Sequence, residues 1–247
     1  MQEQYLNKVI LKRDKVERFD RYPFHIPAVK ALNELPLHPK ITFFVGENGS
    51  GKSTLIEAIA VCCGFNPEGG SRNFSFETYR SHSDLSDYLM IAKGVRHPRD
   101  GYFLRAESFY NVATNIEELD SVSSEAPSIK NSYGGSLHER SHGESFFALL
   151  NNRLGGHGVY ILDEPEAALS PQRQLAMLCR IDDLVKQDSQ FIIATHSPIL
   201  TAYPDSVIYS LSEKGIEKTA YEHTENYQIT RQFLNHYQSM LHDLLDP

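Results

Sequence analysis

Residues 41–54 read ITFFVGENGSGKST, and this stretch decides the fold. Its first five residues are apolar or β-branched, which predicts a buried strand. Residues 46–53 match the pattern G-x-x-x-x-G-K-[ST], whose glycines let successive backbone N–H groups turn toward phosphate oxygens. Residues 53–62 then repeat apolar side chains at helical spacing, and a helix N-terminus attracts anions. The stretch therefore predicts a strand, a phosphate-binding loop and a helix in succession.

The phosphate loop, residues 46–54, predicts a nucleotide ligand together with a magnesium ion. Lys52 supplies a flexible cation for the β- and γ-phosphates, and the Ser53 hydroxyl is the kind of oxygen ligand that Mg²⁺ prefers. The alternative is a glycine-rich turn with an unrelated lysine, but the flanking strand and helix favour the phosphate site. We therefore expect ATP and Mg²⁺ as cofactors, with these ATP contacts: Gly46, Glu47, Asn48, Gly49, Ser50, Gly51, Lys52, Ser53 and Thr54.

Strand and helix patterns alternate along the rest of the chain. Short β-branched or aromatic runs predict further strands at 101–106, 158–162, 190–194 and 206–211. The alternation predicts an α/β fold with a mainly parallel central sheet, beside an N-terminal antiparallel strand region. One intervening helix is predicted by apolar residues at helical spacing: Leu175, Leu178, Ile181 and Val185. A closing amphipathic helix is predicted at 225–245, with this apolar face: Ile229, Phe233, Tyr237, Leu241 and Leu244.

Residues 64–140 differ in composition from the rest of the chain. Within this segment, 64–100 and 112–140 are rich in Ser, Gly, Asn and Pro and hold only short apolar stretches. We expect a small, inserted, partly helical subdomain here, within a single domain that spans 1–247. Residues 121–136 have the composition of a loop, and loops near phosphate sites often carry function.

Composition indicates a globular protein with a packed core, since 40% of the residues are hydrophobic. The net charge of −8 argues against a surface built wholly for nucleic acid. The apolar runs are far shorter than a membrane span and no leader pattern opens the chain, so we expect no membrane insertion. Three cysteines form neither a CxxC pair nor an even disulfide framework, which favours a cytoplasmic location: Cys62, Cys63 and Cys179.

Two carboxylates directly follow the strand predicted at 158–162. Because the carboxyl ends of parallel strands meet at one edge of a sheet, Asp163 is expected beside the phosphate loop, holding Mg²⁺ through the ion's water shell. Glu164 is then placed to polarise the water that attacks the γ-phosphate. The alternative is that both acids cap a helix opened by Pro165. A phosphate loop in the same chain favours the catalytic interpretation, and with it an ATPase.

Residues 140–145 read RSHGES and lead into the apolar helical pattern FFALLNNRL. Ser141 and Glu144 fit a capping box, in which the serine caps the helix and the glutamate returns a hydrogen bond. A capping box accounts for these two residues. It does not account for Gly143, or for the position of the segment shortly before the two carboxylates.

Four segments together resemble the ABC-type ATPases, in particular the soluble branch that includes the SMC proteins and DNA-repair ATPases. GENGSGKST at 46–54 resembles their Walker A loop, and RSHGE at 140–144 resembles their signature motif. YILDEP at 160–165 resembles their Walker B segment, and THSP at 195–198 resembles their histidine switch. The resemblance covers nearly the whole chain with the motifs in the right order. It implies a P-loop NTPase fold and ATP hydrolysis to ADP and phosphate.

The resemblance also implies an ATP-dependent homodimer whose nucleotide sites form across the subunit boundary. The signature residues would contact the γ-phosphate bound to the opposite subunit: Ser141, His142, Gly143 and Glu144. His196 would contact the γ-phosphate or the attacking water, which makes the implied catalytic residues Glu164, His196 and Lys52. The alternative for His196 is a residue that merely leads into a helix start at Ser197 and Pro198.

The sequence departs from the family pattern at several positions. His142 stands where the family has the first glycine of a pair, and Ser170 stands where an aspartate usually ends the D-loop. No glutamine follows the strand at 101–106, so Glu107 is the candidate for that contact on the metal side. Three aromatic residues that precede the loop remain equal candidates for stacking on adenine: Phe19, Tyr22 and Phe24.

These observations predict an ATP-gated dimeric switch that acts on a partner protein or on DNA, in repair or genome defence. The segment between Ser53 and Ser141 is too short for a long coiled-coil arm. The alternative is the nucleotide-binding subunit of an ABC membrane transporter, which the missing glutamine and the RSHGE sequence disfavour. A basic N-terminal run either binds DNA or forms the solvated face of a strand pair: Lys8, Lys12, Arg13, Lys15, Arg18 and Arg21.

Overall fold

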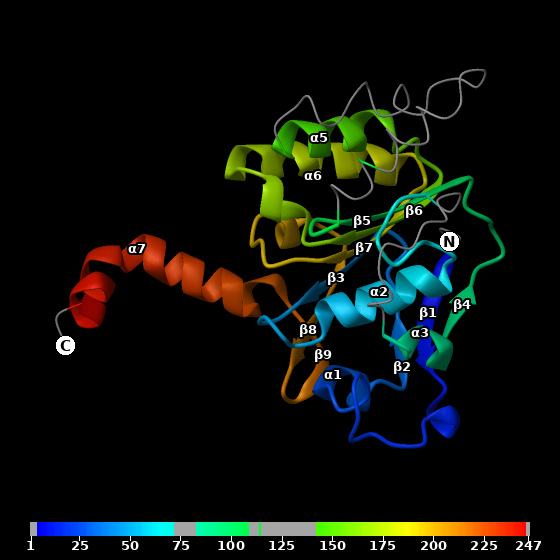
Figure 1. Ribbon diagram of the computed structural model, residues 1–247. Helices are drawn as coiled ribbons and strands as arrows, with labels where there is room; N and C mark the ends of the chain where they lie inside the picture. The colour runs from blue at the N-terminus through cyan, green and yellow to red at the C-terminus, as the bar shows by residue number, and fades with distance from the viewer. Residues whose placement is uncertain (1–3, 72–82, 109–113, 115–141, 246–247) are drawn as a thin grey trace.

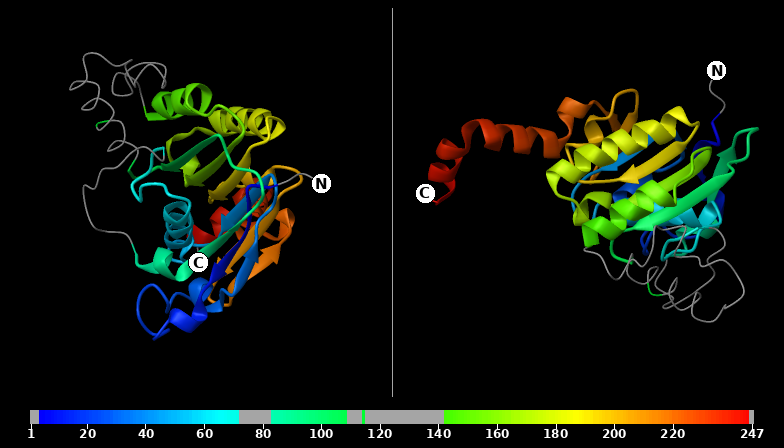
Figure 2. Two further views of the ribbon diagram at one scale, coloured as in Figure 1. Left: turned by 90° about the vertical axis from the view of Figure 1, so that its right-hand side faces the viewer. Right: turned by 90° about the horizontal axis from the view of Figure 1, so that it is seen from above.

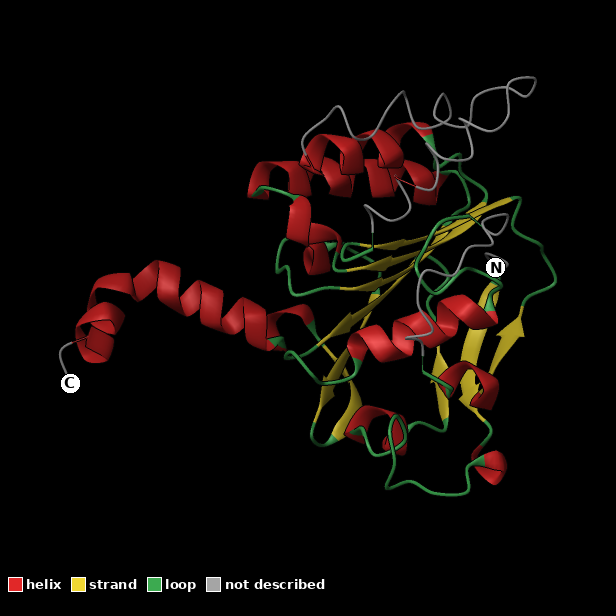
Figure 3. Cartoon of the chain, in the orientation of Figure 1, coloured by secondary structure: helices red, strands yellow, loops and turns green. Residues whose placement is uncertain are grey.

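A six-stranded sheet forms the centre of the molecule in a computed structural model, which describes residues 4–71, 83–108, 114 and 142–245 (Figures 1 and 3). Its order is β5-β6-β7-β3-β8-β9, and every neighbouring pair is parallel except the β8–β9 hairpin. The sheet confirms the predicted α/β fold and all five predicted strands. The bounds are β3 (Ile41–Val45), β5 (Asp100–Arg105), β6 (Gly158–Asp163), β7 (Gln190–Ala194), β8 (Val207–Ser212) and β9 (Gly215–Thr219).

A smaller antiparallel sheet joins the N-terminal region to part of the predicted insertion. Its order is β2-β1-β4, with β1 (Leu6–Leu11), β2 (Glu34–Pro36) and β4 (Leu89–Lys93). The stretch before β4 forms the short helix α3 (Leu85–Tyr88). The buried amide of Gln190, on the large sheet, bonds both the N–H and the carbonyl of Leu6, at 2.9 and 2.8 Å. The two sheets are therefore fastened to each other.

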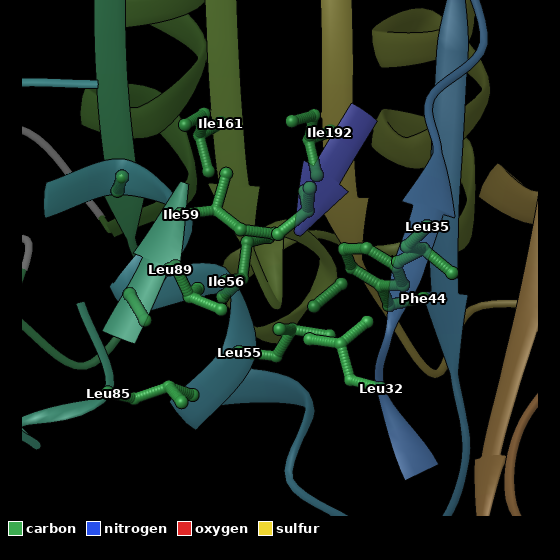
Figure 4. Close-up of a cluster of buried hydrophobic side chains, with 14 of the residues drawn as sticks. Leu32, Leu35, Phe44, Leu55, Ile56, Ile59, Leu85, Leu89, Ile161 and Ile192 are labelled. Atoms are coloured by element: carbon green, nitrogen blue, oxygen red, sulfur yellow. The ribbon is translucent and has the colours of Figure 1, made fainter. Parts of the chain in front are cut away.

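Helices cover both faces of the large sheet (Figure 2). On one face lie α5 (His142–Asn152) and α6 (Pro171–Lys186), whose apolar side chains join those of the strands in one buried cluster. On the other face, α2 (Lys52–Cys62) is packed between the large sheet and the small one. Figure 4 shows Ile56 and Ile59 of α2 among Ile161 and Ile192 of the large sheet and Leu89 of the small one. α2 and the phosphate loop before it are thus held in the core.

Shorter elements complete the described structure. α1 (Pro27–Ala31) packs against the β8–β9 hairpin, and residues 84–92 of the predicted partly helical insertion form α3 and most of β4. Residues 72–82, 109–113 and 115–141 lie outside the described structure, so most of the predicted insertion is not described here. Single 3-10 turns are found at η1 (Arg13–Lys15), η3 (Pro165–Ala168), η4 (Leu200–Ala202) and η5 (Tyr221–His223).

The face assigned to the helix at 171–186 is partly wrong. The side chain of Leu175 is 55% exposed, because the buried stripe of α6 runs through Met177, Ile181 and Leu184 instead. At 100° per residue, Leu175 lies about 120° around the helix from Ile181, outside that stripe. The four residues of the prediction therefore do not share one buried face.

The C-terminal helix exists as predicted, but it does not close the molecule. α7 (Glu225–Leu245) is amphipathic, yet none of its residues is buried, and it extends away from the two sheets (Figure 1). Its backbone is kinked at His236, where φ is −134° and ψ is 30°. Across the part of the chain that is described, no helix has both the length and the apolar character to cross a bilayer.

Candidate nucleotide site

The phosphate loop and the carboxylate after β6 meet at the carboxyl ends of the parallel strands. The Ser53 hydroxyl, in the first turn of α2, lies 3.2 Å from Asp163 Oδ1 and donates a hydrogen bond to it. The two residues are 110 positions apart in the chain. Parallel neighbours β3, β7 and β6 place their carboxyl ends side by side, which produces this meeting. The geometry is the one that the strand and motif pattern predicted.

The backbone of the phosphate loop requires glycine at its two ends. Gly46 has φ of +146° and Gly51 has φ of +97°, backbone angles that residues with a side chain rarely adopt. A Cβ at Gly46 would overlap the carbonyl oxygen of Leu211, and one at Gly51 would lie 2.6 Å from Ile26 Cγ2. The curled loop opens directly into α2, so backbone N–H groups and a helix N-terminus converge on one place. This arrangement suits an anionic ligand.

The Lys52 side chain is buried within the loop, with only 3% of the residue exposed. Its Nζ donates hydrogen bonds to the carbonyl oxygens of Gly46 and Glu47, each at 2.9 Å. Burial lowers the pKa of Lys52, while the nearby carboxylates of Glu164 and Asp163 oppose that shift. The chain therefore holds a desolvated cation beside two acids, at the centre of the candidate site.

Asp163 is buried at the end of β6, with 3% of the residue exposed. Burial raises its pKa to about 7, and Glu164 acts in the same direction, whereas Arg105 and the Ser53 hydroxyl stabilise the charged form. A bound divalent cation would favour the carboxylate in the same way as Arg105 does. Asp163 is thus a carboxyl group whose ionisation depends on positive charge nearby.

Arg105 belongs to the site although the sequence pattern did not reveal it. It is level with Asp163 in the β5–β6 pairing, and its Nε lies 3.7 Å from Asp163 Oδ2. Its Nη1 forms an ion pair of 2.5 Å with Glu57, which lies on α2. The alignment of the ends of the two predicted strands is the signal that could have found it. Arg105 connects α2, β5 and β6 behind the candidate metal ligands.

Glu164 occupies a strained position directly after Asp163. Its φ of 51° and ψ of 50° lie in the left-handed region, which is unfavourable for a side-chain-bearing residue. The 3-10 turn η3 begins at Pro165, as the capping alternative requires, but the Glu164 side chain makes no capping hydrogen bond. Instead its Oε1 lies 3.5 Å from Nε2 of His196. The backbone turn therefore directs the carboxylate toward the histidine.

The main chain of His196 is held from both sides by side chains. Glu166 Oε1 accepts a hydrogen bond of 2.6 Å from the His196 N–H, and the Asn226 amide donates one of 2.8 Å to the His196 carbonyl. The alternative role of the segment is also present, since the Ser197 hydroxyl accepts bonds from the N–H groups of Ile199 and Leu200. Neither Glu166 nor Asn226 was singled out in the sequence, which gives no local signal for Asn226.

The predicted signature lies away from the phosphate loop of its own chain. Ser141 is outside the described residues, α5 begins at His142, and Glu144 lies 3.9 Å from Arg173. Gly143 lies so close to Arg173 and to the Ala168 carbonyl that a Cβ there would overlap both. The cavity at the phosphate loop is lined by neither Gly143 nor Glu144. Within one chain, these residues are thus not brought to the candidate nucleotide site.

Glu107 and Ser170 lie at the outer edge of the same group of strand ends. Glu107 is 81% exposed at its side chain, with Oε2 3.7 Å from Arg105 Nη2. It lines one cavity of about 570 Å³ together with Glu164 and Ser170. Ser170 caps α6, since its hydroxyl accepts a hydrogen bond of 3.4 Å from the Arg173 N–H. Glu107 therefore lies near the Glu164 carboxylate. Among the described residues, no hydrogen bond or ion pair joins Glu107 to Ser53 or Asp163.

The three aromatic candidates for adenine contact differ in position. Phe24 is buried in the core at 1% exposure, and Phe19 packs edge-on against it while Arg13 lies 4.4 Å above the Phe19 ring. Tyr22 is 60% exposed and lines a cavity of about 310 Å³ at the phosphate loop. His25, Lys52 and Glu164 line the same cavity. Tyr22 is thus the one of the three that faces the candidate site.

The donor set fits a magnesium ion that is held mainly by nucleotide oxygens and water. Among the described residues, no group of three or more His, Cys, Asp and Glu side chains could hold a metal ion by itself. The chain offers one hydroxyl, on Ser53, and one carboxylate, on Asp163, side by side. Mg²⁺ usually takes few protein ligands and keeps several waters beside substrate phosphates. The residues present therefore fit the group that the motif implies.

Comparison with known proteins agrees with this architecture. A sequence family described as an AAA domain matches residues 26–135, a range that contains the phosphate loop. The structure is similar to cbiO1 from Clostridium perfringens, part of the ABC transporter complex cbiONQ, with a TM-score of 0.51 at 18% identity, covering 99% of this chain and 100% of that one. It is also similar to the SMC head domain from Thermotoga maritima, with a TM-score of 0.47 at 16% identity, covering 88% and 100%. No curated protein sequence matches the chain.

The chain has the α/β fold of P-loop NTPases, a fold that it shares with cbiO1. The match to the AAA-domain family is confined to residues 26–135. The cbiO1 likeness, at 18% identity, bears on the fold alone. The family match ends before Asp163 and His196, so the roles of these residues rest on the geometry described above.

Proposed function

We propose that the chain is a magnesium-dependent ATPase whose nucleotide site lies between the phosphate loop and the end of β6. The observation that carries the proposal is the 3.2 Å contact between Ser53 Oγ and Asp163 Oδ1, beside the buried Lys52. Three glycines of the loop, at φ of +146°, +81° and +97°, give it the curled backbone that phosphate binding requires. The proposed ATP contacts are those of residues 46–54.

In this proposal each polar side chain has a separate task. Ser53 and Asp163 hold the magnesium ion, and Lys52 binds the β- and γ-phosphates. The ion supplies positive charge to the phosphate oxygens when it is bound. Glu164 accepts a proton from the attacking water, and His196, 3.5 Å from Glu164, positions that carboxylate and contacts the γ-phosphate. The exposed ring of Tyr22 is placed to stack on the base.

Two copies would complete the site in the proposed active state. Gly143 and Glu144 lie at the start of α5, away from the phosphate loop of their own chain, which supports a contact with the nucleotide of a second copy. Ser141 and His142 belong to the same proposed contact. The start of α5 also brings a helix N-terminus, which favours phosphate. ATP would therefore join the two nucleotide sites, and its hydrolysis would separate them.

The proposed output is a change in the association of the two copies, passed to a partner protein or to DNA. Several residues of the N-terminal basic run already have partners in the chain: Lys8 pairs with Glu34, Arg18 pairs with Asp20, and Arg13 donates to the Leu32 carbonyl. This favours the solvated-face interpretation of the run. Stimulation of the ATPase by DNA, with steep salt dependence, would favour DNA as the partner instead. The alternative of a transporter subunit has only the fold likeness to cbiO1 in support.

Two measurements on the purified chain test the proposal. Phosphate release from ATP should require Mg²⁺ and stop with EDTA, and Glu164→Gln should lower the rate by about 100-fold or more while ATP still binds. In size-exclusion chromatography, at a concentration low enough for the chain to be monomeric without nucleotide, ATP should raise the dimer fraction of Glu164→Gln. The matched control is Glu217→Gln, at an exposed position of β9. Absence of ATP binding would refute the nucleotide site, and ATP binding without any change in association would refute the two-copy site.

A further inference from the structure

Helix α7 carries most of the large apolar side chains that the molecule exposes. Of the eleven such residues in the described ranges, seven lie on this helix, and none of its residues is buried. Their exposures run from 38% to 72%: Ile229, Phe233, Leu234, Tyr237, Leu241, Leu244 and Leu245. Contiguous apolar surface of this kind on a polar protein marks an interaction site. Figures 1 and 2 show that α7 stands clear of both sheets over most of its length.

The contacts between α7 and the rest of the chain lie in its first turns. Asn226 donates to the His196 carbonyl at 2.8 Å, and the ring of Tyr227 lies 4.6 Å from that of Tyr221. Beyond residue 235, the Gln238 and Ser239 side chains bond to their own helix, at Tyr237 and His236. In water, most helix stability in proteins comes from packing of the apolar face. A helix of 21 residues with an exposed apolar face therefore needs a partner surface.

The charges on α7 limit the chemistry of that partner. Between 225 and 245 the formal charges at neutral pH are Glu225, Arg231 and Asp243, so the helix carries a single Arg and no Lys. Helices that lie on membrane surfaces usually have Lys and Arg along the polar face, and nucleic-acid contacts also need several cations. The polar face of α7 instead holds neutral residues such as Gln232 and Ser239. An apolar protein surface is the occupant that fits.

The apolar pattern of α7 is complementary to itself. Counted outward from Tyr237, Phe233 has its counterpart in Leu241, Ile229 in Leu245, and Leu234 in Met240. Two such helices packed antiparallel about Tyr237 would place the members of these three apolar pairs level with one another. A two-fold symmetric interface requires this kind of self-complementary patch. The kink at His236 lies one residue from that centre, so the two arms of the helix are of similar length.

We propose that α7 is a dimerisation surface that pairs antiparallel with α7 of a second copy of this chain, centred on Tyr237. This goes beyond the proposed ATPase, because the contact does not involve nucleotide and persists when ATP is absent. The start of α7 is bonded to the main chain of His196, so the pairing is connected to the loop beside the reactive carboxylate. The two copies would therefore remain associated through α7 while their nucleotide sites open and close.

The mass of the full chain in solution, measured by light scattering without nucleotide, tests the pairing. We expect a dimer, and we expect Phe233→Glu with Leu241→Glu to weaken its association at least tenfold. The matched control is Gln232→Glu with Ser239→Glu, which adds the same charge on the polar side of the same helix and should leave the dimer unchanged. Circular dichroism and ATP binding check that both variants remain folded. A monomeric wild-type chain, or equal loss of dimer in both variants, would overturn the proposal.

Cysteine cross-linking tests the orientation of the two helices. In a Cys179→Ser background, which removes the exposed native thiol, Tyr237→Cys should form a disulfide-linked dimer under mild oxidation by copper phenanthroline. Ser239→Cys, on the polar side, should not. Efficient linking through Leu245→Cys would indicate parallel helices and overturn the antiparallel pairing. Wild-type binding to neutral or anionic vesicles in place of dimer formation would assign the surface to lipid and overturn it too. Since no nucleotide is present, failure here leaves the proposed ATPase standing, and loss of ATPase activity leaves this test intact.

Discussion

Helices α2 and α7 both begin beside the candidate nucleotide site, but α2 is buried on nearly all sides, whereas α7 is amphipathic and exposed. α2 is enclosed between the large sheet and the small one, and Leu55, Ile56 and Ile59 are fully buried. α7 shares hydrogen bonds with the body only near its start and exposes its apolar face. The difference teaches that two neighbouring helices can be held in different ways: α2 is enclosed by the core along its length, whereas α7 is bonded to the core near its start.

The largest expected effect is on the free energy of unfolding, which should fall far more for a truncation in α2 than for the same truncation in α7. Ile59→Ala removes a buried side chain from α2 and should lower the free energy of unfolding by about 3–4 kcal/mol, because it loses apolar burial and leaves a cavity. Ile229→Ala makes the same change at a 55% exposed position of α7 and should alter it by less than about 0.5 kcal/mol. Urea denaturation, at a concentration where the chain is monomeric, measures both. Equal losses would mean that α7 is packed on the body.

A second prediction compares the effect on ATP affinity of removing one cation from the start of α2, Lys52, and one from α7, Arg231. Lys52→Ala removes the buried cation of the phosphate loop and should weaken ATP affinity by about 100-fold, or about 2.7 kcal/mol. Arg231→Ala removes the single arginine of α7 and should leave the affinity within about twofold. Isothermal titration calorimetry with Mg-ATP provides the values. Unchanged affinity in Lys52→Ala would place the nucleotide elsewhere.

Asp163 predicts a pH dependence of stability that a neutral side chain on α7 should lack. Burial raises the Asp163 pKa to about 7, above its value in the unfolded chain, so the folded state binds the proton more tightly. Its stabilising contribution is complete below about pH 4 and is lost as the pH rises through about 7. Asp163→Asn should therefore gain about 2 kcal/mol of stability relative to the wild type between pH 5 and pH 8, without nucleotide. Gln238→Ala, which removes a neutral side chain from an exposed position of α7, should show no such trend in the same denaturation series.

Glu166 predicts the smallest effect, on the rate of hydrolysis. Its carboxylate holds the His196 N–H at 2.6 Å, so Glu166→Ala should lower kcat by about tenfold, or about 1.4 kcal/mol, while KM for ATP stays within about twofold. Glu166→Gln keeps an acceptor oxygen and should restore most of the rate. Gln228→Ala, at an exposed position of α7, is the control. A loss confined to KM, or no rescue by glutamine, would argue against a positioning role for Glu166.

The sequence predicted the fold, and the meeting of the phosphate loop with Asp163, because both follow from local patterns. The phosphate loop is a contiguous motif between a strand and a helix, and Asp163 follows a strand whose carboxyl end must meet it. The helix at 225–245 was predicted with its apolar face, but a face does not specify what covers it. The expectation that α7 closes the molecule was wrong for this reason.

The remaining residues of the site, around Arg105 and His196, are held by contacts between distant parts of the chain. Arg105 meets Glu57 across 48 positions, and Asn226 meets His196 across 30. No spacing rule connects such pairs, since they depend on strand register and on the path of the chain after β9. The left-handed turn at Glu164 is equally hidden, because no glycine or asparagine stands there to indicate it. The role of the signature segment remains a prediction, since its proposed contact is with a second copy.

The left-handed backbone at Glu164 has a consequence for selection. A glycine or asparagine would relax this turn, so a screen for thermal stability alone should enrich Glu164→Gly and Glu164→Asn. Both variants discard the carboxylate that faces His196. Under the role proposed for Glu164, the substitutions that relax the backbone would also lower turnover, so selection for durability and selection for activity would oppose each other at this position.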